Sequence, residues 1–328
     1  MGKAGISIDN LSFVQENIRI IEGLSLEVPR GSRFGLLGPK NTGKTSLIHL
    51  LTGSLKPDSG TMDVFGFEPQ SQAMEIRHRM GIMLNPPELY DSLNIMDNME
   101  FHGWARELNS EDRQDRIHEL LNHFGLWEKR RYLVESLSVE EKLRLGMATL
   151  FLHRPPLIFL DEPTAGLDPM AALRLRESLG LLIDNRPLLT VFLTTDNQAD
   201  AARFCERVAI FHQGKILKEG TPAELGLSTE LPRLRLAGEG FNPTILHLLI
   251  AEPEVDQAEI HDGNLYITLN AGIDLAYLTG VIEEAGAKIH GTFWEENMGD
   301  ILAGLIQNDN EKEIKQKKKE EKSKKNGK

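Results

Sequence analysis

The segment from Gly38 to Thr45 has the residue types and spacing of a phosphate-binding loop. Its sequence GPKNTGKT fits the pattern G-x-x-x-x-G-K-T, with the apolar run SRFGLLG before it and the helix-like run TSLIHLLTG after it. In that setting, backbone N–H groups of the loop and the helix N-terminus can surround a phosphate chain. Lys44 would reach the outer phosphates and Thr45 would place its hydroxyl on Mg²⁺. The residues predicted to bind the nucleotide here are Gly38, Pro39, Lys40, Asn41, Thr42, Gly43, Lys44, Thr45 and Ser46.

Two consecutive acidic residues follow another apolar run, in the segment PPLIFLDEPTAGLDP. Asp161 closes the run, where its carboxylate can reach the same metal ion as Thr45, through water. Glu162 is placed to act as the general base that activates an attacking water. The sequence therefore predicts Thr45 and Asp161 as metal ligands and Glu162 as a catalytic residue.

Strand-like and helix-like segments alternate in the first part of the chain, which predicts an α/β domain. The short apolar runs SRFGLLG, LIFLD and LLTVFLTTD suit strands buried on both faces of a parallel sheet. The pattern turns helical between these strands. We expect an α/β domain over residues 1–228, with a helical subdomain over about 86–154.

The remaining residues predict a second, smaller domain over 229–307. They read strand, helix, strand, strand, helix, strand, an order typical of a ferredoxin-like α+β module, followed by a last helix in ENMGDILAGLIQ. The final segment, 308–328, has nine lysines against five acidic residues and almost nothing apolar. It predicts a disordered tail, with contact to anionic lipid as the alternative.

These motifs together resemble the ATP-binding subunits of ABC transporters. The resemblance runs from about Ile6 to Glu224 and depends on GPKNTGKT, LIFLDEP and AGLD, in the order of the family. The C-terminal module is similar to that of the bacterial drug-resistance and bacitracin-export type. The resemblance implies a P-loop NTPase sheet of the ABC ATPase type with a helical subdomain, and ATP and Mg²⁺ as cofactors.

The resemblance also implies partners. In the family two such domains enclose two ATP molecules, so we expect a homodimer or a second ABC ATP-binding subunit. No apolar run approaches the ~20 residues that span a bilayer, so a separate membrane permease subunit would carry the substrate. The chain would then be cytoplasmic and peripheral on the inner face of the membrane. The net charge of −12 argues against nucleic acid as a partner, and the single cysteine, Cys205, is expected to be buried and inert.

The family's signature motif, usually L-S-G-G-Q, aligns with LSVEE at Leu137 to Glu141. In the family its glycines let backbone amides approach the terminal phosphate bound by the partner chain, and Ser138 is the matching nucleotide contact. Here Val139 and Glu140 replace the glycines. A second negative charge ~4 Å from the phosphate would cost about 4 kcal/mol at an effective dielectric constant of ~20. Ser138 and Glu141 also fit a capping box, so the helix start is retained while its phosphate contact is weakened.

Other positions also depart from the family. Asp196 stands where the family has a catalytic switch histidine, and it is also predicted to cap the helix of NQADAARFC. Asn85 replaces a glutamine that contacts nucleotide and metal. The adenine-stacking aromatic aligns with Gln15, since Phe13 lies out of register. Asn41 replaces a glycine, a mild change because asparagine tolerates left-handed backbone.

Three functions follow. The first is an ATPase subunit that drives an exporter, with slow hydrolysis. The second is a degenerate regulatory subunit of a heteromeric pair with negligible ATPase of its own. The third is a soluble ABC factor outside transport. A methionine group around residues 74–99 leaves docking of a membrane subunit or ordinary packing open.

Overall fold

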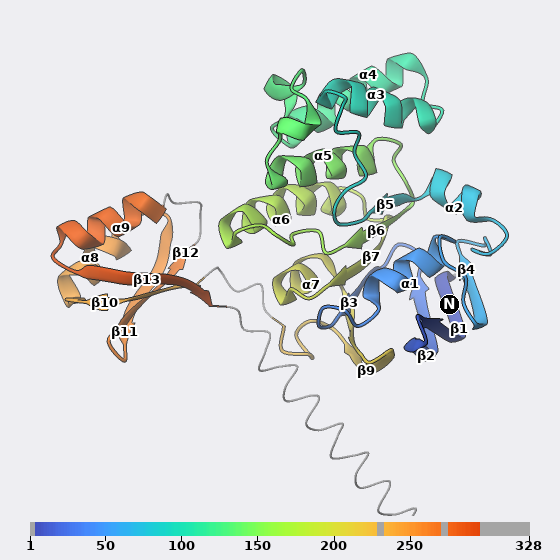
Figure 1. Cartoon of the computed structure of the whole chain (residues 1–328). Helices are drawn as coiled ribbons and strands as arrows, with labels where there is room; N and C mark the ends of the chain where they lie inside the picture. The colour runs from blue at the N-terminus through green and yellow to red at the C-terminus, as the bar shows by residue number, and fades with distance from the viewer. Residues whose placement is uncertain (1–3, 228–232, 270–274, 296–328) are drawn as a thin grey trace, which may run out of the picture.

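The computed structural model describes residues 4–227, 233–269 and 275–295. Its centre is a six-stranded sheet in the order β5-β6-β7-β3-β8-β9, which confirms the predicted α/β fold (Figure 1). The first five of these strands are parallel, and β9 pairs antiparallel with β8. Their bounds are β5 Gly81–Met83, β6 Leu157–Asp161, β7 Thr190–Thr195, β3 Arg33–Leu37, β8 Arg207–His212 and β9 Lys215–Gly220.

A separate antiparallel sheet at the N-terminus was not predicted. It has the order β2-β1-β4, with bounds β1 Ala4–Gln15, β2 Ile18–Pro29 and β4 Ser59–Val64. Glu16 and Asn17 join β1 to β2 with φ values of 50 and 64, the left-handed values that tight hairpins use. The expected strand–helix alternation therefore does not hold before the phosphate-binding loop.

The helices cover both faces of the six-stranded sheet and extend beyond it (Figure 1). A group of three lies in the region predicted to be helical, with two short 3₁₀ turns between the second and third of them. The helices outside the C-terminal domain are α1 Lys44–Leu51, α2 Ala73–Arg79, α3 Ile95–Ala105, α4 Ser110–His123, α5 Val139–Phe151, α6 Pro169–Asp184 and α7 Gln198–Phe204; the 3₁₀ turns are Trp127–Lys129 and Val134–Ser136.

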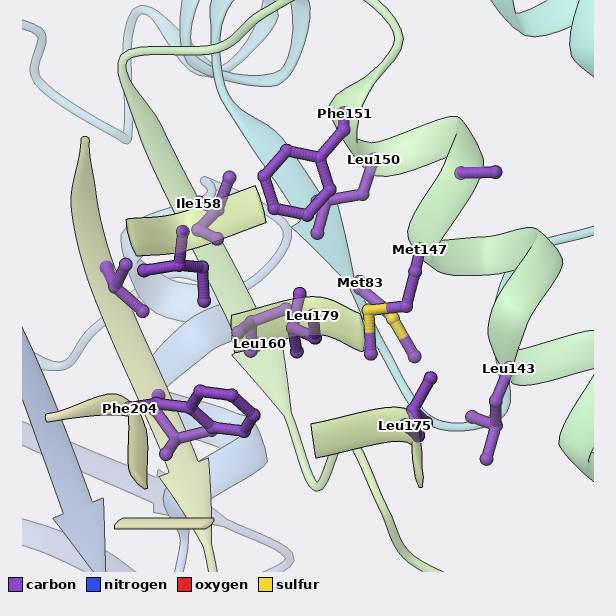
Figure 2. Packing of buried hydrophobic residues seen from close by; sticks show 14 of the residues in the cluster. Met83, Leu143, Met147, Leu150, Phe151, Ile158, Leu160, Leu175, Leu179 and Phe204 are labelled. Atoms are coloured by element: carbon purple, nitrogen blue, oxygen red, sulfur yellow. The ribbon is translucent and has the colours of Figure 1, made fainter. Parts of the chain in front are cut away.

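Side chains of the central strands alternate between two apolar cores. Ile158 and Leu160 of β6 join the core that α5 and α6 complete, as Figure 2 shows. Leu157 and Phe159 of the same strand join the core shared with α1 and the antiparallel sheet. Each side chain of this kind contributes about 1.5–3 kcal/mol when fully buried. Burial of side chains on both faces fixes the position of β6 between the two cores. Asp161 is the last residue of the strand and lies at the edge of the sheet.

The C-terminal residues form a four-stranded antiparallel sheet in the order β11-β12-β10-β13. The elements are β10 Arg233–Glu239, α8 Pro243–Ile250, β11 Val255–His261, β12 Asn264–Leu269, α9 Leu275–Glu284 and β13 Lys288–Glu295. Their order and pairing confirm the ferredoxin-like prediction. Met170 and the half-buried Leu173, both on α6, belong to the same apolar cluster as this domain's core. The predicted last helix, 296–307, and the tail, 308–328, lie outside the described residues.

Two expectations from composition can be compared with the structure. Cys205 is buried, as predicted, and burial raises the pKa of its thiol. Within the described ranges, no helix is both long enough and apolar enough to span a bilayer.

Candidate active site

The phosphate-binding loop connects β3 to α1 at the carboxyl edge of the parallel sheet. Glycine is required at two of its positions. A Cβ on Gly38 would lie 2.1 Å from the carbonyl oxygen of Phe211, and one on Gly43 would lie 2.5 Å from Cγ2 of Ile20. Asn41 has φ 61, in the left-handed region that asparagine tolerates. The loop therefore lies tightly against its neighbours, with its backbone close to any ligand that it holds.

Lys44 is almost fully buried at the start of α1. Its Nζ donates to the carbonyl oxygens of Gly38 and Pro39, both at 2.8 Å, and lies 3.1 Å from Oε1 of Glu162. The hydroxyl of Thr42 also donates to Pro39, at 2.8 Å. The ammonium is thus held at the mouth of the loop, between the loop carbonyls and the acidic side chain that follows β6.

Asp161 and Thr45 meet as the sequence predicts. Thr45 Oγ1 donates to Oδ2 of Asp161 at 2.7 Å, and Thr194 of the neighbouring strand donates to Oδ1. Asp161 is only 2% exposed. A carboxylate and a hydroxyl form an oxygen donor pair, which fits Mg²⁺, an ion that takes few protein ligands together with phosphates and waters. Thr45 and Asp161 could therefore hold the metal, with Ser46 following in the first turn of α1.

Glu162 is the group best placed to take a proton. Burial raises its pKa to about 7, against the opposing effect of the Lys44 charge. Its Oε2 accepts a hydrogen bond from the backbone N–H of Asp196 at 3.0 Å. Its own backbone is left-handed, with φ 46, and its N–H donates to Thr194 at 2.8 Å. The strained backbone aims the carboxylate at Lys44 instead of continuing the strand.

Asp196 lies at the site, although not in the capping role predicted for it. The cap of α7 is Asn197, whose side chain accepts from the N–H groups of Ala199 and Asp200. The N-cap prediction for Asp196 was therefore wrong by one position. Its carboxylate instead lies 3.7 Å from Nζ of Lys40, which is 77% exposed. Since exposed ion pairs contribute only about 0.2–1 kcal/mol, Lys40 compensates the charge of Asp196 weakly.

Asn85 and Ser138 lie differently with respect to this cluster. Asn85 Nδ2 donates to the carbonyl oxygen of Glu162 at 3.4 Å, so it belongs to the site. Ser138 caps α5, in the capping box that the sequence predicts: Glu141 N–H donates to Ser138 Oγ at 3.2 Å, and Ser138 N–H donates to Oε2 of Glu141 at 2.9 Å. Among the described residues, no hydrogen bond joins the Ser138 side chain to the loop at Gly38 to Thr45.

The charge of Glu140 is compensated inside this chain. Arg144, one turn further along α5, hydrogen bonds to its carboxylate, and Arg174 of α6 lies 3.6 Å from the second oxygen. The repulsion expected from a free carboxylate is therefore reduced. Val139 remains 60% exposed in the first turn of the helix. Bulk at the glycine positions, more than charge, now distinguishes this segment from the family motif.

Sequence reasoning missed some residues of the site. Thr194 holds Asp161, and Ile20 of β2 lies against Gly43. The run LTT before Asp196 was a signal for Thr194, because neighbouring parallel strands bring their last residues together. Nothing in the sequence indicated Ile20. Phe13 is buried in the core at 6% exposure and Gln15 is exposed at the end of β1, so Phe13 cannot stack on a base.

The chain is similar to known proteins over most of its length. A family profile described as ABC transporter matches residues 21–165. The chain is 31% identical to the daunorubicin resistance ATP-binding protein DrrA3 of Streptomyces coeruleorubidus, across 84% of this chain and 91% of that protein. It is 32% identical to the lipopolysaccharide export system ATP-binding protein LptB of Escherichia coli, across 73% of this chain and 99% of that protein.

A solved structure supports the fold. The dimeric structure of an ATP-binding cassette in a post-hydrolysis state with ADP and phosphate matches with a TM-score of 0.60 and 20% identity. The match covers 66% of this chain and 98% of the cassette. The matches to DrrA3 and LptB cover most of the length of each relative. The site contains the loop, metal and base residues expected of such proteins. The chain therefore belongs to the ABC transporter family, as an ATP-binding subunit and P-loop ATPase.

Proposed function

We propose that this chain binds ATP with Mg²⁺ at the cluster around Lys44 and Glu162, hydrolyses it slowly, and thereby drives export through a separate permease. The observation that carries the proposal is the pair of contacts at the carboxyl edge of the sheet. Lys44 lies 3.1 Å from Glu162, and Thr45 donates to Asp161 at 2.7 Å. Phosphate, metal and base residues are thus within reach of one another.

The residues divide the reaction among them. Lys44 would exchange its loop carbonyls for phosphate oxygens and stabilise negative charge there. Glu162 would accept the proton of the water that attacks the terminal phosphate. Thr45 and Asp161 would hold Mg²⁺, which would supply Lewis acidity that offsets charge on the phosphates. Asn85 donates to the backbone carbonyl oxygen of Glu162 and would help to keep the base in place.

Slow turnover is proposed from two departures from the family pattern, one in this chain's own site and one at the nucleotide that the partner chain binds. Asp196 offers a carboxylate where the family has an imidazole donor, and Lys40 offsets its charge only weakly. Val139 occupies a signature position at which the family's glycine lets backbone amides approach phosphate. Asp196 lacks the donor of the imidazole, and the bulk of Val139 keeps backbone donors away from the terminal phosphate, where charge develops in the transition state.

Proteins of this family work as dimers with membrane permease subunits. We propose that this chain does so as well, and the altered signature favours a second, different ATP-binding subunit over a second copy. A different subunit with signature glycines would complete the site that contains Glu162. A homodimer would combine two altered signatures with two sites that lack the histidine. If this chain had negligible ATPase activity of its own, it would be a degenerate regulatory subunit within the same pair of different subunits.

A cavity of about 260 Å³ is the proposed docking place for the permease. It lies between the end of α1, β5, α3 and α5, and the charged or titratable residues that line it are His49, Arg77, Glu88, His102 and Arg106. Arg106 donates to the backbone carbonyl of Arg77 at its rim. With two arginines against one carboxylate, the cavity favours an acidic side chain on a helix end of the permease.

Aromatic side chains beside the cavity extend the same surface. Trp104 is 70% exposed, and the ring centroids of Tyr90 and Phe101 lie 4.6 Å apart. Exposed aromatic groups next to a charged cavity are typical of protein interfaces. Met74 is also exposed, while Met80, Met83 and Met99 are buried, so packing accounts for most of the methionine group. The permease would cover Tyr90, Phe101 and Trp104.

Nucleotide binding tests the proposal most simply. Lys44→Met should weaken ATP·Mg binding about ten- to hundredfold, because a charge-assisted hydrogen bond contributes about 1.5–3 kcal/mol. Lys218→Met, at an exposed position on β9, is the control and should bind as the wild type does. Titration calorimetry with a slowly hydrolysed ATP analogue measures both. Unchanged binding by Lys44→Met would refute the proposed site.

A further inference from the structure

A buried ion pair lies behind the proposed active site. Asp200 on α7 is 1% exposed and Arg176 on α6 is 7% exposed, and Nε of Arg176 donates to Oδ1 of Asp200 at 2.6 Å. Neither residue touches the groups assigned to phosphate, metal or proton transfer. Removing two charges from water is costly, and apolar side chains of similar volume often stabilise a fold as well. The pair therefore calls for a role beyond stability.

The second oxygen of Asp200 indicates what that role is. Its Oδ2 accepts a hydrogen bond from Thr164 Oγ1 at 2.7 Å and another from Thr195 Oγ1 at 3.4 Å. Thr164 comes two residues after Glu162, and Thr195 comes directly before Asp196. One carboxylate oxygen thus joins the segment after the catalytic base to the segment of the switch position.

The same two segments also meet inside the site. The backbone N–H of Asp196 donates to Oε2 of Glu162 at 3.0 Å. Thr195 Oγ1 also accepts from the N–H of Asn197 at 2.9 Å, which fixes the turn that presents Asp196. The Glu162–Asp196 hydrogen bond and the contacts to Asp200 therefore form a closed ring of interactions. If the contacts at Asp200 loosen, the hydrogen bond to the base loosens with them.

We propose that Asp200 is a positioning residue, which with Arg176 holds Thr164 and Thr195 so that Glu162 keeps its orientation toward the nucleotide. This rests on the proposed function for its catalytic consequence, while the structural coupling stands independently. Arg176 holds Oδ1 of Asp200 in place, and Oδ2 of Asp200 in turn holds both hydroxyls. The α6 helix that carries Arg176 also carries Arg174, the partner of Glu140, so one helix contacts both altered regions of the chain.

The test uses the smallest change that breaks one contact. Thr164→Val keeps the shape of the side chain and removes its hydroxyl, whereas Thr164→Ser keeps the hydroxyl. Amide hydrogen exchange of the full-length protein, measured by mass spectrometry, shows whether the segment around Thr195 has become more mobile. Amide exchange over residues 193–199 should be at least fivefold faster in Thr164→Val and unchanged in Thr164→Ser. The reciprocal variant, Thr195→Val, should speed exchange over residues 163–168 and serves if Thr164→Val does not fold.

Kinetics provide a second readout that a local packing role would not change. Thr164→Val should lower kcat at least fivefold while the Kd for ATP·Mg stays within twofold, and Thr164→Ser should restore kcat. If the variants fold and amide exchange in the segment opposite the substituted threonine is unchanged, the positioning role is overturned. A wild-type protein that neither binds nor hydrolyses ATP would overturn the proposed function instead, and the exchange result would still decide the coupling.

Discussion

Nζ of Lys44 lies 3.1 Å from Oε1 of Glu162, so the lysine proposed to bind phosphate and the proposed catalytic base form an ion pair at the mouth of the loop. Lys44 is nearly buried, and the carboxylate is 16% exposed. The two groups have different tasks in the proposed reaction: Lys44 stabilises phosphate charge, while Glu162 accepts a proton. Their contact means that phosphate oxygens and the attacking water must share one small region.

Glu162→Gln should abolish hydrolysis while ATP stays bound. The amide keeps the size and hydrogen-bonding capacity of the side chain but cannot accept the proton, so kcat should fall about 10²- to 10⁴-fold. Phosphate release measures kcat, and equilibrium binding measures Kd. Glu177→Gln, an exposed glutamate on α6, is the matched control and should hydrolyse ATP at the wild-type rate. Full activity in Glu162→Gln would mean that another group is the base.

Thr45→Val should raise the Mg²⁺ concentration needed for ATP binding. The variant removes the hydroxyl proposed as a metal ligand and its 2.7 Å hydrogen bond to Asp161. Since Thr45 is exposed, the stability cost should be small. Thr45→Ser retains the hydroxyl and should behave as the wild type. An unchanged magnesium requirement in Thr45→Val, read from binding titrations at fixed ATP, would remove Thr45 from the metal site.

His153 should make the fold less stable in mild acid. Burial lowers its pKa to about 3, with the charge of Arg106 adding to the effect. In the unfolded chain the pKa is about 6.5, so between these values the unfolded state binds more protons. The free energy of unfolding should therefore fall as pH drops below about 6.5, by roughly 2 kcal/mol at pH 5.

His153→Met tests this pH dependence. The variant cannot gain the proton, so its free energy of unfolding should change less between pH 7 and pH 5 than that of the wild type. The remaining slope includes His102, whose pKa burial also lowers. His261→Met, at an exposed histidine, should leave the wild-type slope unchanged. Equal slopes for His153→Met and the wild type in urea titrations would contradict the assignment.

Arg77→Glu should weaken the association with the permease. The side chain lines the cavity between α1 and α3, and reversing its charge would repel an acidic group on the permease. Arg79→Glu on the same helix changes net charge equally without lining the cavity. Tagged chains purified from native membranes in detergent should retain a multispanning membrane protein with the wild type and Arg79→Glu, and lose it with Arg77→Glu. Equal recovery in all three would place the docking surface elsewhere.

Much of the site could be predicted because its residues lie where buried strands end. The apolar runs before Gly38 and Asp161 placed both at one edge of the sheet, where the structure brings Thr45 and Asp161 together. The C-terminal fold followed from the order of its elements for a similar reason, since each strand and helix has its own apolar period. The local sequence pattern is sufficient to predict the fold where each segment buries a single apolar face.

Tertiary contacts explain what could not be predicted. The pairing of Glu140 with Arg174 joins two helices, and no spacing in the sequence indicates it. The cap of α7 moved from Asp196 to Asn197 because the chain turns at Thr195, whose hydroxyl accepts from Asn197. The antiparallel sheet at the N-terminus was missed because its long strands lack the continuous apolar character of the parallel ones.

The most direct test of slow turnover is to restore the missing donors in the complex purified with its permease. Val139→Gly, Glu140→Gly and Asp196→His together rebuild the family's signature glycines and switch imidazole. The account predicts at least a tenfold rise in kcat with little change in the Kd for ATP, and Glu162→Gln should remove the part of the gain that comes from Asp196→His. A wild-type complex that already turns over at about 1 s⁻¹ or faster, within the ordinary range of enzymes, with no gain in the restored variant, would contradict it.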